Sequence, residues 1–155
     1  MFLYLIQHGE AKSEKEDPER GLTEKGIEDI KRVARFLSPM NLSVSQIYHS
    51  GKKRALQTAE LYAEYLKPER GLTIAEGLAP LDDPHIWFEK LSSINEDVCL
   101  VGHLPHLERL SSLLLCGDPQ KKIINFRMGG IVCLKRIDQV WSMEWAVVPE
   151  IVKKI

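Results

Sequence analysis

Two histidines and an arginine carry the strongest chemical signal in this sequence. His8 and His103 each follow a continuous apolar run, and Arg54 comes shortly after a third, shorter one. A neutral imidazole held in one tautomer can attack phosphorus, and a guanidinium can grip phosphoryl oxygens. These residue types therefore predict phosphoryl transfer, in which one histidine attacks while the other histidine and Arg54 neutralise the transferring oxygens.

The elements that must position these residues alternate between strand and helix. The apolar runs predict strands, and apolar residues at helical spacing predict helices after four of the strands. This alternation predicts right-handed βαβ units and a mainly parallel sheet. The highly charged segment 12–20 predicts a solvated loop. Strands are expected at 1–7, 45–49, 72–75, 97–102, 129–136 and 140–147, and helices at 24–37, 54–66, 86–91 and 105–116.

A parallel sheet would bring the three residues to one edge, because ligands bind outside the carboxyl ends of its strands. Arg54 would open a helix there, and the unpaired N–H groups of a helix N-terminus favour an anion. Lys52 would add local positive charge, and Gly9 would let the backbone approach the ligand closely. We therefore expect a site for a dianionic, tetrahedral group.

The length, composition and net charge of the chain exclude several classes of function. A chain of 155 residues with 44% hydrophobic and 28% charged residues predicts one globular domain over 1–155. Its net charge of −1 gives no field to attract nucleic acid or a membrane surface. The cysteines have no metal or disulfide spacing, and His106, three residues after His103, lacks a third ligand, so no metal is expected. A cytoplasmic location is expected from the cysteine usage and the lack of a targeting segment.

Four sequence blocks resemble the histidine phosphatase (phosphoglycerate mutase-like) superfamily. Gln-His-Gly-Glu-Ala at 7–11 resembles its Arg-His-Gly signature, and 49–60 resembles its Ser-Pro-x-x-Arg-Ala-x-Gln-Thr-Ala block. Leu-Val-Gly-His-Leu-Pro-His-Leu at 100–107 is similar to its Val-Gly-His-x-Pro block, and 22–26 matches its Leu-Thr-x-x-Gly. The short length looks like the SixA-type phosphohistidine phosphatase branch.

The resemblance implies a three-layer α/β/α sandwich and a cofactor-independent enzyme that becomes phosphorylated on His8. It implies that Arg54 grips the phosphoryl oxygens, that His103 stabilises their charge, and that Gly9 belongs to the signature turn. Gln7 departs from the family, because it replaces the first arginine with a neutral amide. The loss of this charge predicts that phosphate binds more weakly by roughly 1.5–3 kcal/mol. Lys52 or Lys53 would replace part of the missing positive charge.

The proton donor and the substrate are less defined by the sequence. Glu76, Asp82 and Asp83 lie in the loop where relatives carry a carboxylate, and Asp83 is the preferred candidate. Weak acid placement favours a phosphoramidate, whose imidazole leaves more readily than an alkoxide. We therefore expect a phosphatase that acts on phosphohistidine of a protein. The alternatives are a small-molecule phosphomonoesterase and a non-catalytic module that binds phosphorylated partners.

Overall fold

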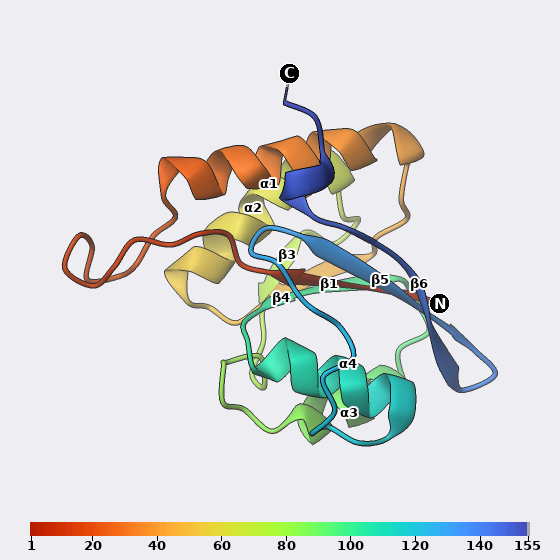
Figure 1. The fold of residues 1–155 in the computed structure, drawn as a ribbon. Helices are drawn as coiled ribbons and strands as arrows, with labels where there is room; N and C mark the ends of the chain where they lie inside the picture. The colour runs from red at the N-terminus through yellow and green to blue at the C-terminus, as the bar shows by residue number, and fades with distance from the viewer. Residues whose placement is uncertain (155) are drawn as a thin grey trace.

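The computed structural model describes residues 1–154 and contains a six-stranded sheet with helices on both faces (Figure 1). Every predicted strand and helix is present, with boundaries shifted by at most a few residues. Within these residues, no helix is long and apolar enough to cross a membrane. The strands are β1 (Phe2–Gln7), β2 (Gln46–His49), β3 (Leu72–Ile74), β4 (Val98–Gly102), β5 (Ile131–Ile137) and β6 (Val140–Val147). The helices are α1 (Glu24–Leu37), α2 (Lys53–Leu66), α3 (Pro84–Ser92) and α4 (His106–Cys116), with 3-10 turns η1 (Ser38–Met40) and η2 (Pro149–Ile151).

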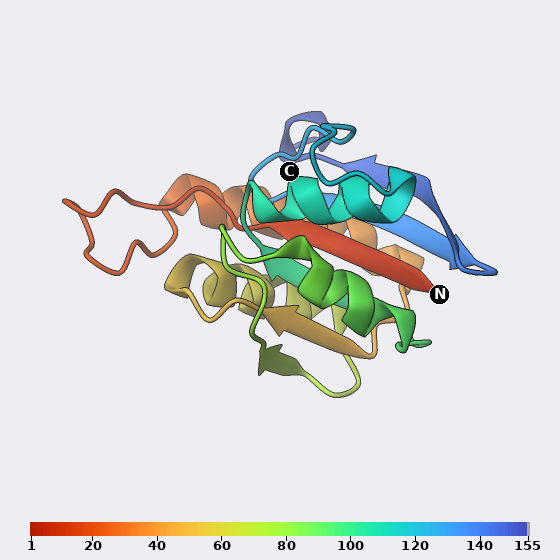
Figure 2. The same cartoon turned by 90° about the horizontal axis from the view of Figure 1, so that it is seen from below.

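The sheet has the strand order β3-β2-β4-β1-β5-β6. The first four strands of the chain run parallel to one another, whereas β5 is antiparallel to β1 and pairs with β6 as a hairpin. Both the mainly parallel sheet and the terminal hairpin are thus confirmed. Figures 1 and 2 show α1 and α2 on one face and α3 and α4 on the other, which is the expected three-layer sandwich.

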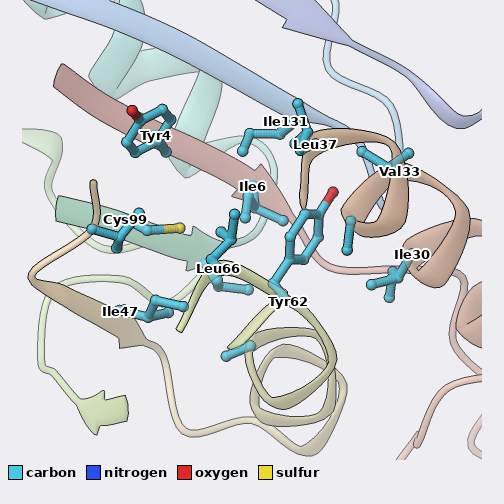
Figure 3. Packing of buried hydrophobic residues seen from close by; sticks show 14 of the residues in the cluster. Tyr4, Ile6, Ile30, Val33, Leu37, Ile47, Tyr62, Leu66, Cys99 and Ile131 are labelled. Atoms are coloured by element: carbon cyan, nitrogen blue, oxygen red, sulfur yellow. The ribbon is translucent and has the colours of Figure 1, made fainter. Parts of the chain in front are cut away.

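Strand β1 lies at the centre of two hydrophobic cores because its side chains alternate between the faces of the sheet. Tyr4 and Ile6 pack with residues of α1 and α2, as Figure 3 shows. Leu3 and Leu5 pack on the opposite face with residues of α3 and α4. Each fully buried side chain of this kind contributes about 1.5–3 kcal/mol. Burial on both faces fixes the position of β1 and, with it, of the residues that follow it.

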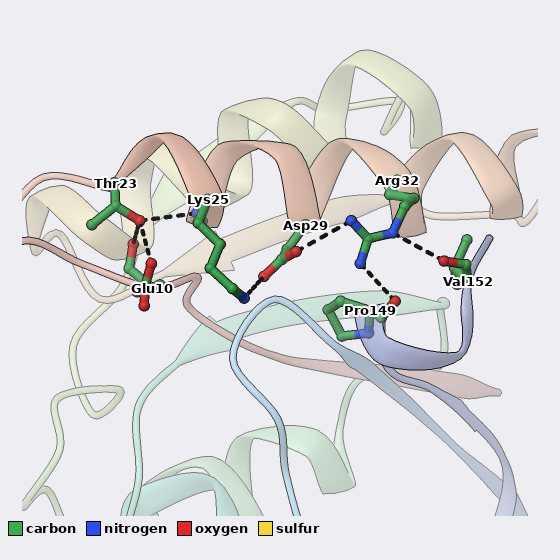
Figure 4. A network of polar contacts seen from close by, with 8 residues as sticks. Glu10, Thr23, Lys25, Asp29, Arg32, Pro149 and Val152 are labelled. Atoms are coloured by element: carbon green, nitrogen blue, oxygen red, sulfur yellow. Dashed lines mark hydrogen bonds and ion pairs between the residues drawn. The ribbon is translucent and has the colours of Figure 1, made fainter. Parts of the chain in front are cut away.

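Helix α1 begins at a side-chain cap and holds the C-terminal segment. Thr23 caps the helix by accepting a hydrogen bond of 3.0 Å from the backbone N–H of Gly26, as its position predicts. Arg32, one of the residues in Figure 4, donates to the carbonyl oxygens of Pro149 and Val152 at 2.7 and 3.0 Å. These bonds tie the segment after β6 to the outer face of α1.

The loops that follow the parallel strands meet at one edge of the sheet. In Figure 2, the loop between β1 and α1 protrudes beyond the tips of the strand arrows at this edge. An isolated bridge between Ala11 and Leu22 closes the base of that loop. The segments after β2, β3 and β4 begin at the same edge, because these strands pair in parallel register. The fold therefore brings four separate parts of the chain to a common place.

Candidate active site

The structure brings His8 and His103 together at the carboxyl edge of the sheet. Gln7 and Gly102 are register partners at the ends of β1 and β4, and the backbone N–H of His8 donates to the Gly102 carbonyl at 3.0 Å. The two imidazole centroids lie 5.0 Å apart, with the rings inclined by 50°. Arg54, in the first turn of α2, is close enough for its charge to lower the pKa of both rings. The predicted convergence of the three residues is therefore present.

His8 is held in the tautomer that suits a nucleophile. Its Nδ1 lies 2.7 Å from the carbonyl oxygen of Gly9, which can only accept, so Nδ1 carries the hydrogen. The other nitrogen, Nε2, then has a free lone pair whenever the ring is neutral. Burial lowers the pKa of His8 below 6.5, and the charges of Arg54 and Arg20 lower it further. The neutral ring thus predominates near pH 7.

His103 is buried and bonded to a serine that the sequence interpretation did not single out. Its Nε2 lies 2.6 Å from the hydroxyl oxygen of Ser50, which follows β2. Burial, followed by the charges of His8 and Arg54, lowers the pKa of His103 to about 3. Its Nδ1 is buried without a hydrogen-bond partner among residues 1–154. A phosphoryl anion beside the ring would supply a partner and favour the imidazolium form.

Two arginines approach the histidines without acidic partners. Neither Arg54 nor Arg20 forms an ion pair within the described chain, and Nε of Arg54 is buried without a hydrogen-bond partner there. Burial lowers the pKa of Arg54, and the charge of Arg20 adds to this effect. Both line a cavity of about 670 Å³ together with Lys52. Glu14, Glu19 and Lys53 also line this cavity, so its four cations outnumber its two carboxylates, and this excess of positive charge favours an anionic ligand.

Arg20 is the main residue that the sequence interpretation missed. Segment 12–20 is mostly exposed, as predicted for a solvated loop, but Arg20 is half-buried and its charge reaches His8. Its Nε donates to the Lys12 carbonyl at 3.0 Å, and its backbone has a φ of 53°. A signal was present, because Arg20 lies two residues before the recognised Leu-Thr-x-x-Gly block.

The two predicted lysines differ in their surroundings. Lys52 is exposed at the N-cap position of α2, and its charge contributes to the lowered pKa of His103. Lys53 instead binds Asp17 and Glu19, each at 3.4 Å from Nζ. Lys52 therefore remains a candidate phosphate-binding residue, whereas Lys53 holds the protruding loop against α2.

Gly9 and Gln7 both flank His8, with different environments. The backbone N–H of Gly9 donates to the Thr58 hydroxyl at 3.0 Å, and that hydroxyl donates to the Arg54 carbonyl at 2.7 Å. This chain of bonds couples the turn after β1 to helix α2. Gln7 is buried, and its side-chain oxygen has no hydrogen-bond partner in the described residues. An unpaired buried oxygen of this kind costs about 1–3 kcal/mol, which marks Gln7 as part of the polar site.

The carboxylate favoured as proton donor caps a helix instead. Asp83 is the N-cap of α3, and its Oδ1 lies 2.9 Å from both the backbone nitrogen and Nδ1 of His85. These bonds, the backbone one first, lower the pKa of Asp83, so its carboxyl group carries no proton to donate near neutral pH. Asp82 and Glu76 are instead the carboxylates that line a cavity together with Ser50. The geometry therefore does not favour Asp83 as the donor.

His49 and His106 are buried and are not part of the pair formed by His8 and His103. His49 is buried, and its Nδ1 accepts a hydrogen bond of 3.1 Å from the backbone of Gly51. His106 is buried with neither ring nitrogen paired in residues 1–154, and burial lowers its pKa to about 4. Across the same residues, no group of three or more His, Cys, Asp or Glu is placed to hold a metal ion.

Comparison with known proteins identifies the family and the fold. The sequence pattern of the histidine phosphatase superfamily (branch 1) matches residues 3–82. No curated protein matches the sequence.. Among solved structures, the protein histidine phosphatase SixA complexed with tungstate is similar at a TM-score of 0.85 and 21% identity, over 96% of this chain and 97% of that one.

Two further solved structures are similar, and one of them is named for a different activity. A protein from Agrobacterium tumefaciens assigned as a phosphohistidine phosphatase SixA has a TM-score of 0.76 and 19% identity over 96% of this chain and 97% of that one. A phosphoserine phosphatase variant from Entamoeba histolytica in complex with phosphoserine has a TM-score of 0.68 and 18% identity over 94% and 95%. At these identities the likeness establishes the fold, while the matched pattern over more than half of the chain establishes the family. The chain belongs to the histidine phosphatase superfamily, branch 1.

Proposed function

We propose that this chain is a phosphatase that hydrolyses phosphohistidine on a protein through a phospho-His8 intermediate. The observation that carries the proposal is the set of unpaired polar groups around a neutral His8. Nε of Arg54 and Nδ1 of His103 are buried without a hydrogen-bond partner among residues 1–154, and neither Arg54 nor Arg20 forms an ion pair there. Unpaired buried groups are costly in a folded protein unless a ligand satisfies them. A phosphoryl group has the charge and the oxygens to do so.

The reaction would proceed in two displacements at phosphorus. Nε2 of His8 attacks, a new N–P bond forms, and the P–N bond to the substrate imidazole breaks with its electron pair. The arginines neutralise the equatorial oxygens, and His103 donates a hydrogen bond to one of them. Water then attacks phospho-His8, which releases inorganic phosphate and a proton and restores the neutral ring. The Gly9 carbonyl holds Nδ1–H of His8 in both steps.

The role of Asp83 as a helix cap supports a phosphoramidate substrate. Asp83 is occupied in capping α3 and has a lowered pKa, so it is a poor proton donor. A phosphoimidazole protonated on its other ring nitrogen releases a neutral imidazole without help from a strong acid. An alkyl phosphate requires a donor for its alkoxide, and such a donor is typically worth about 10²–10⁴-fold in rate. The similar structures titled as phosphohistidine phosphatases are consistent with this choice of substrate.

Arg20 also supports catalysis over binding alone. Gln7 removes the family's first arginine, and a site without that charge would favour a non-catalytic module. Arg20 supplies a guanidinium whose charge acts on both His8 and Arg54. The site therefore retains two arginines for the equatorial oxygens. We infer that the departure at Gln7 weakens phosphate binding without removing activity.

The test compares three substrates on the wild type and on His8→Ala. We expect the wild type to hydrolyse phosphoimidazole and a phosphohistidine peptide faster than p-nitrophenyl phosphate, and His8→Ala to hydrolyse none. Acid-labile label from a phosphohistidine substrate should be trapped on the wild type in a rapid quench and be absent from the variant. Faster cleavage of the aryl ester would instead indicate a phosphomonoesterase. No turnover above His8→Ala on any substrate would indicate a binding module.

A further inference from the structure

Ser50, whose hydroxyl group contacts His103, also lines a second cavity. This cavity has a volume of about 560 Å³ and is lined by Ser50, segments around β3 and the first part of α3. It shares no lining residue with the cavity of Arg20 and Arg54, although the neighbours Ser50 and Gly51 line one cavity each. The two cavities therefore meet at the turn after β2. A substrate whose phosphoryl group lies beside the arginines can extend its remaining part into the second cavity.

The second cavity has an exposed aliphatic border. Ile74 and Ile86 line the cavity and are 65% and 41% exposed, and Leu81, which precedes the lining residue Asp82 in the chain, is 79% exposed. The Ile74 side chain lies against the turn after β2, because a Cβ on Gly51 would come within 2.4 Å of its Cδ1. Figure 2 shows β3, the loop after it and α3 along one side of the sheet. Large aliphatic groups gathered beside a catalytic site are typical of a surface that docks a partner.

Charge differs sharply between the two cavities. The charged residues that line the second cavity are Glu76 and Asp82. The first cavity is lined by four cations (Arg20, Lys52, Lys53 and Arg54) and by two carboxylates (Glu14 and Glu19). Neither Glu76 nor Asp82 forms an ion pair within residues 1–154. The site as a whole therefore complements a substrate that carries a dianion at one point and a cation a short distance away.

We propose that this second surface docks the polypeptide segment next to the phosphohistidine and selects aliphatic residues together with Lys or Arg in that segment. We call it the acidic docking surface, and its residues are Ile74, Glu76, Leu81, Asp82 and Ile86. The inference rests on the proposed function, because it names the kind of phosphoprotein that the site accepts. Aliphatic side chains would cover the exposed border, and a cation would pair with the carboxylates.

Defined peptides separate this inference from the proposed function. One phosphohistidine peptide carries Leu and Lys beside the modified residue, the second carries Gly and Glu, and phosphoimidazole has no flanking residues. We expect kcat/KM for the Leu/Lys peptide to exceed that for the Gly/Glu peptide by about tenfold or more at low salt. The preference should shrink at high salt, because charge pairs at the surface are screened.

Variants assign the preference to the acidic docking surface. Leu81→Lys should lower kcat/KM for the Leu/Lys peptide by about tenfold and leave hydrolysis of phosphoimidazole unchanged. Glu76→Lys should invert the ratio between the two peptides, whatever its effect on the absolute rate. Val140→Lys is the matched control, since Val140 is 67% exposed on β6 at the other end of the sheet. It should change neither the peptide rates nor their ratio.

Each negative result has a distinct meaning. Equal kcat/KM for the two peptides, or a ratio that Glu76→Lys leaves unchanged, would overturn the docking inference while the phosphatase stands. Loss of phosphoimidazole hydrolysis in Leu81→Lys, with the fold intact by circular dichroism, would also overturn it, because the residue would then act on the chemistry. Absence of turnover on every phosphohistidine substrate would refute the proposed function itself.

Discussion

Replacing Arg20 with glutamine tests whether this residue offsets the missing signature arginine. Arg20 is half-buried beside Arg54, and no acidic side chain in the described chain neutralises either guanidinium. Arg20→Gln keeps a long polar side chain and removes only the charge and the guanidinium fork. The loop around Arg20 is mostly exposed, which limits the cost of the substitution to folding. The variant therefore isolates the contribution of the second arginine to phosphoryl binding.

The expected loss follows from the strength of a charge-assisted hydrogen bond. Such a bond is worth about 1.5–3 kcal/mol, which corresponds to roughly a 10- to 150-fold change in an equilibrium or rate constant. Both kcat/KM and the inhibition constant for tungstate should weaken within this range. The pKa of His8 should rise toward 6.5, because Arg20 contributes to its depression. An NMR titration of the His8 ring measures this shift without reference to turnover.

The assay compares variants at one fixed salt concentration. Arg35→Gln is the matched control, because Arg35 is exposed on α1 and lines neither site cavity. Gln7→Arg restores the family's charge, so Arg20→Gln should cost less in that background than in the wild type. The reasoning fails if Arg20→Gln stays within about twofold of the wild type in both affinity and kcat/KM. Equal losses in the two backgrounds would show that Arg20 does not replace the missing arginine.

Three further changes probe the site and the fold that supports it. Ser50→Ala removes the hydrogen-bond partner of His103 and should lower kcat by about 2- to 12-fold, the range expected for one hydrogen bond of 0.5–1.5 kcal/mol. Steady-state kinetics measure this change. An unchanged kcat together with unchanged NMR chemical shifts of the His103 ring nitrogens would contradict the prediction. Gly26→Ala would place a Cβ 2.4 Å from the Glu10 carbonyl oxygen and should destabilise the protein by about 1–3 kcal/mol in urea unfolding, whereas an unchanged midpoint would show that the contact relaxes freely. Burial lowers the pKa of His106 to about 4, so the unfolded chain binds a proton first as the pH falls. The free energy of unfolding should therefore decline from pH 6.5 toward pH 4, by about 1.4 kcal/mol for each unit of difference between the folded and unfolded pKa values of His106. In His106→Gln, the midpoint of urea unfolding should depend less on pH across this range.

The fold could be anticipated because its signals are local and periodic. Continuous apolar runs identified the buried parallel strands, and Thr23 with its helical spacing located the start of α1. The terminal hairpin followed from two alternating segments with a short connection. Such features depend on neighbours a few residues apart, so they can be recognised without knowing the tertiary arrangement.

The site divided into residues with a motif and residues without one. His8, Arg54 and His103 stand in recognisable blocks, and the structure places them around one point. Arg20 lies in a charged segment whose composition predicts a solvated loop, and its approach to Arg54 depends on how that loop folds back. Asp83 and Asp82 are adjacent in the chain, yet one caps a helix and the other lines a cavity.

The sequence by itself determined the strands, the helices and the chemical types of the principal site residues, because each follows from local patterning and side-chain chemistry. Only the tertiary structure decided which groups are neutral, which are unpaired and which carboxylates line a cavity. Those properties depend on burial and on charges from distant parts of the chain, as the lowered pKa of His103 illustrates. Desolvation and Coulomb interactions act through space, so they have no signature in the order of residues.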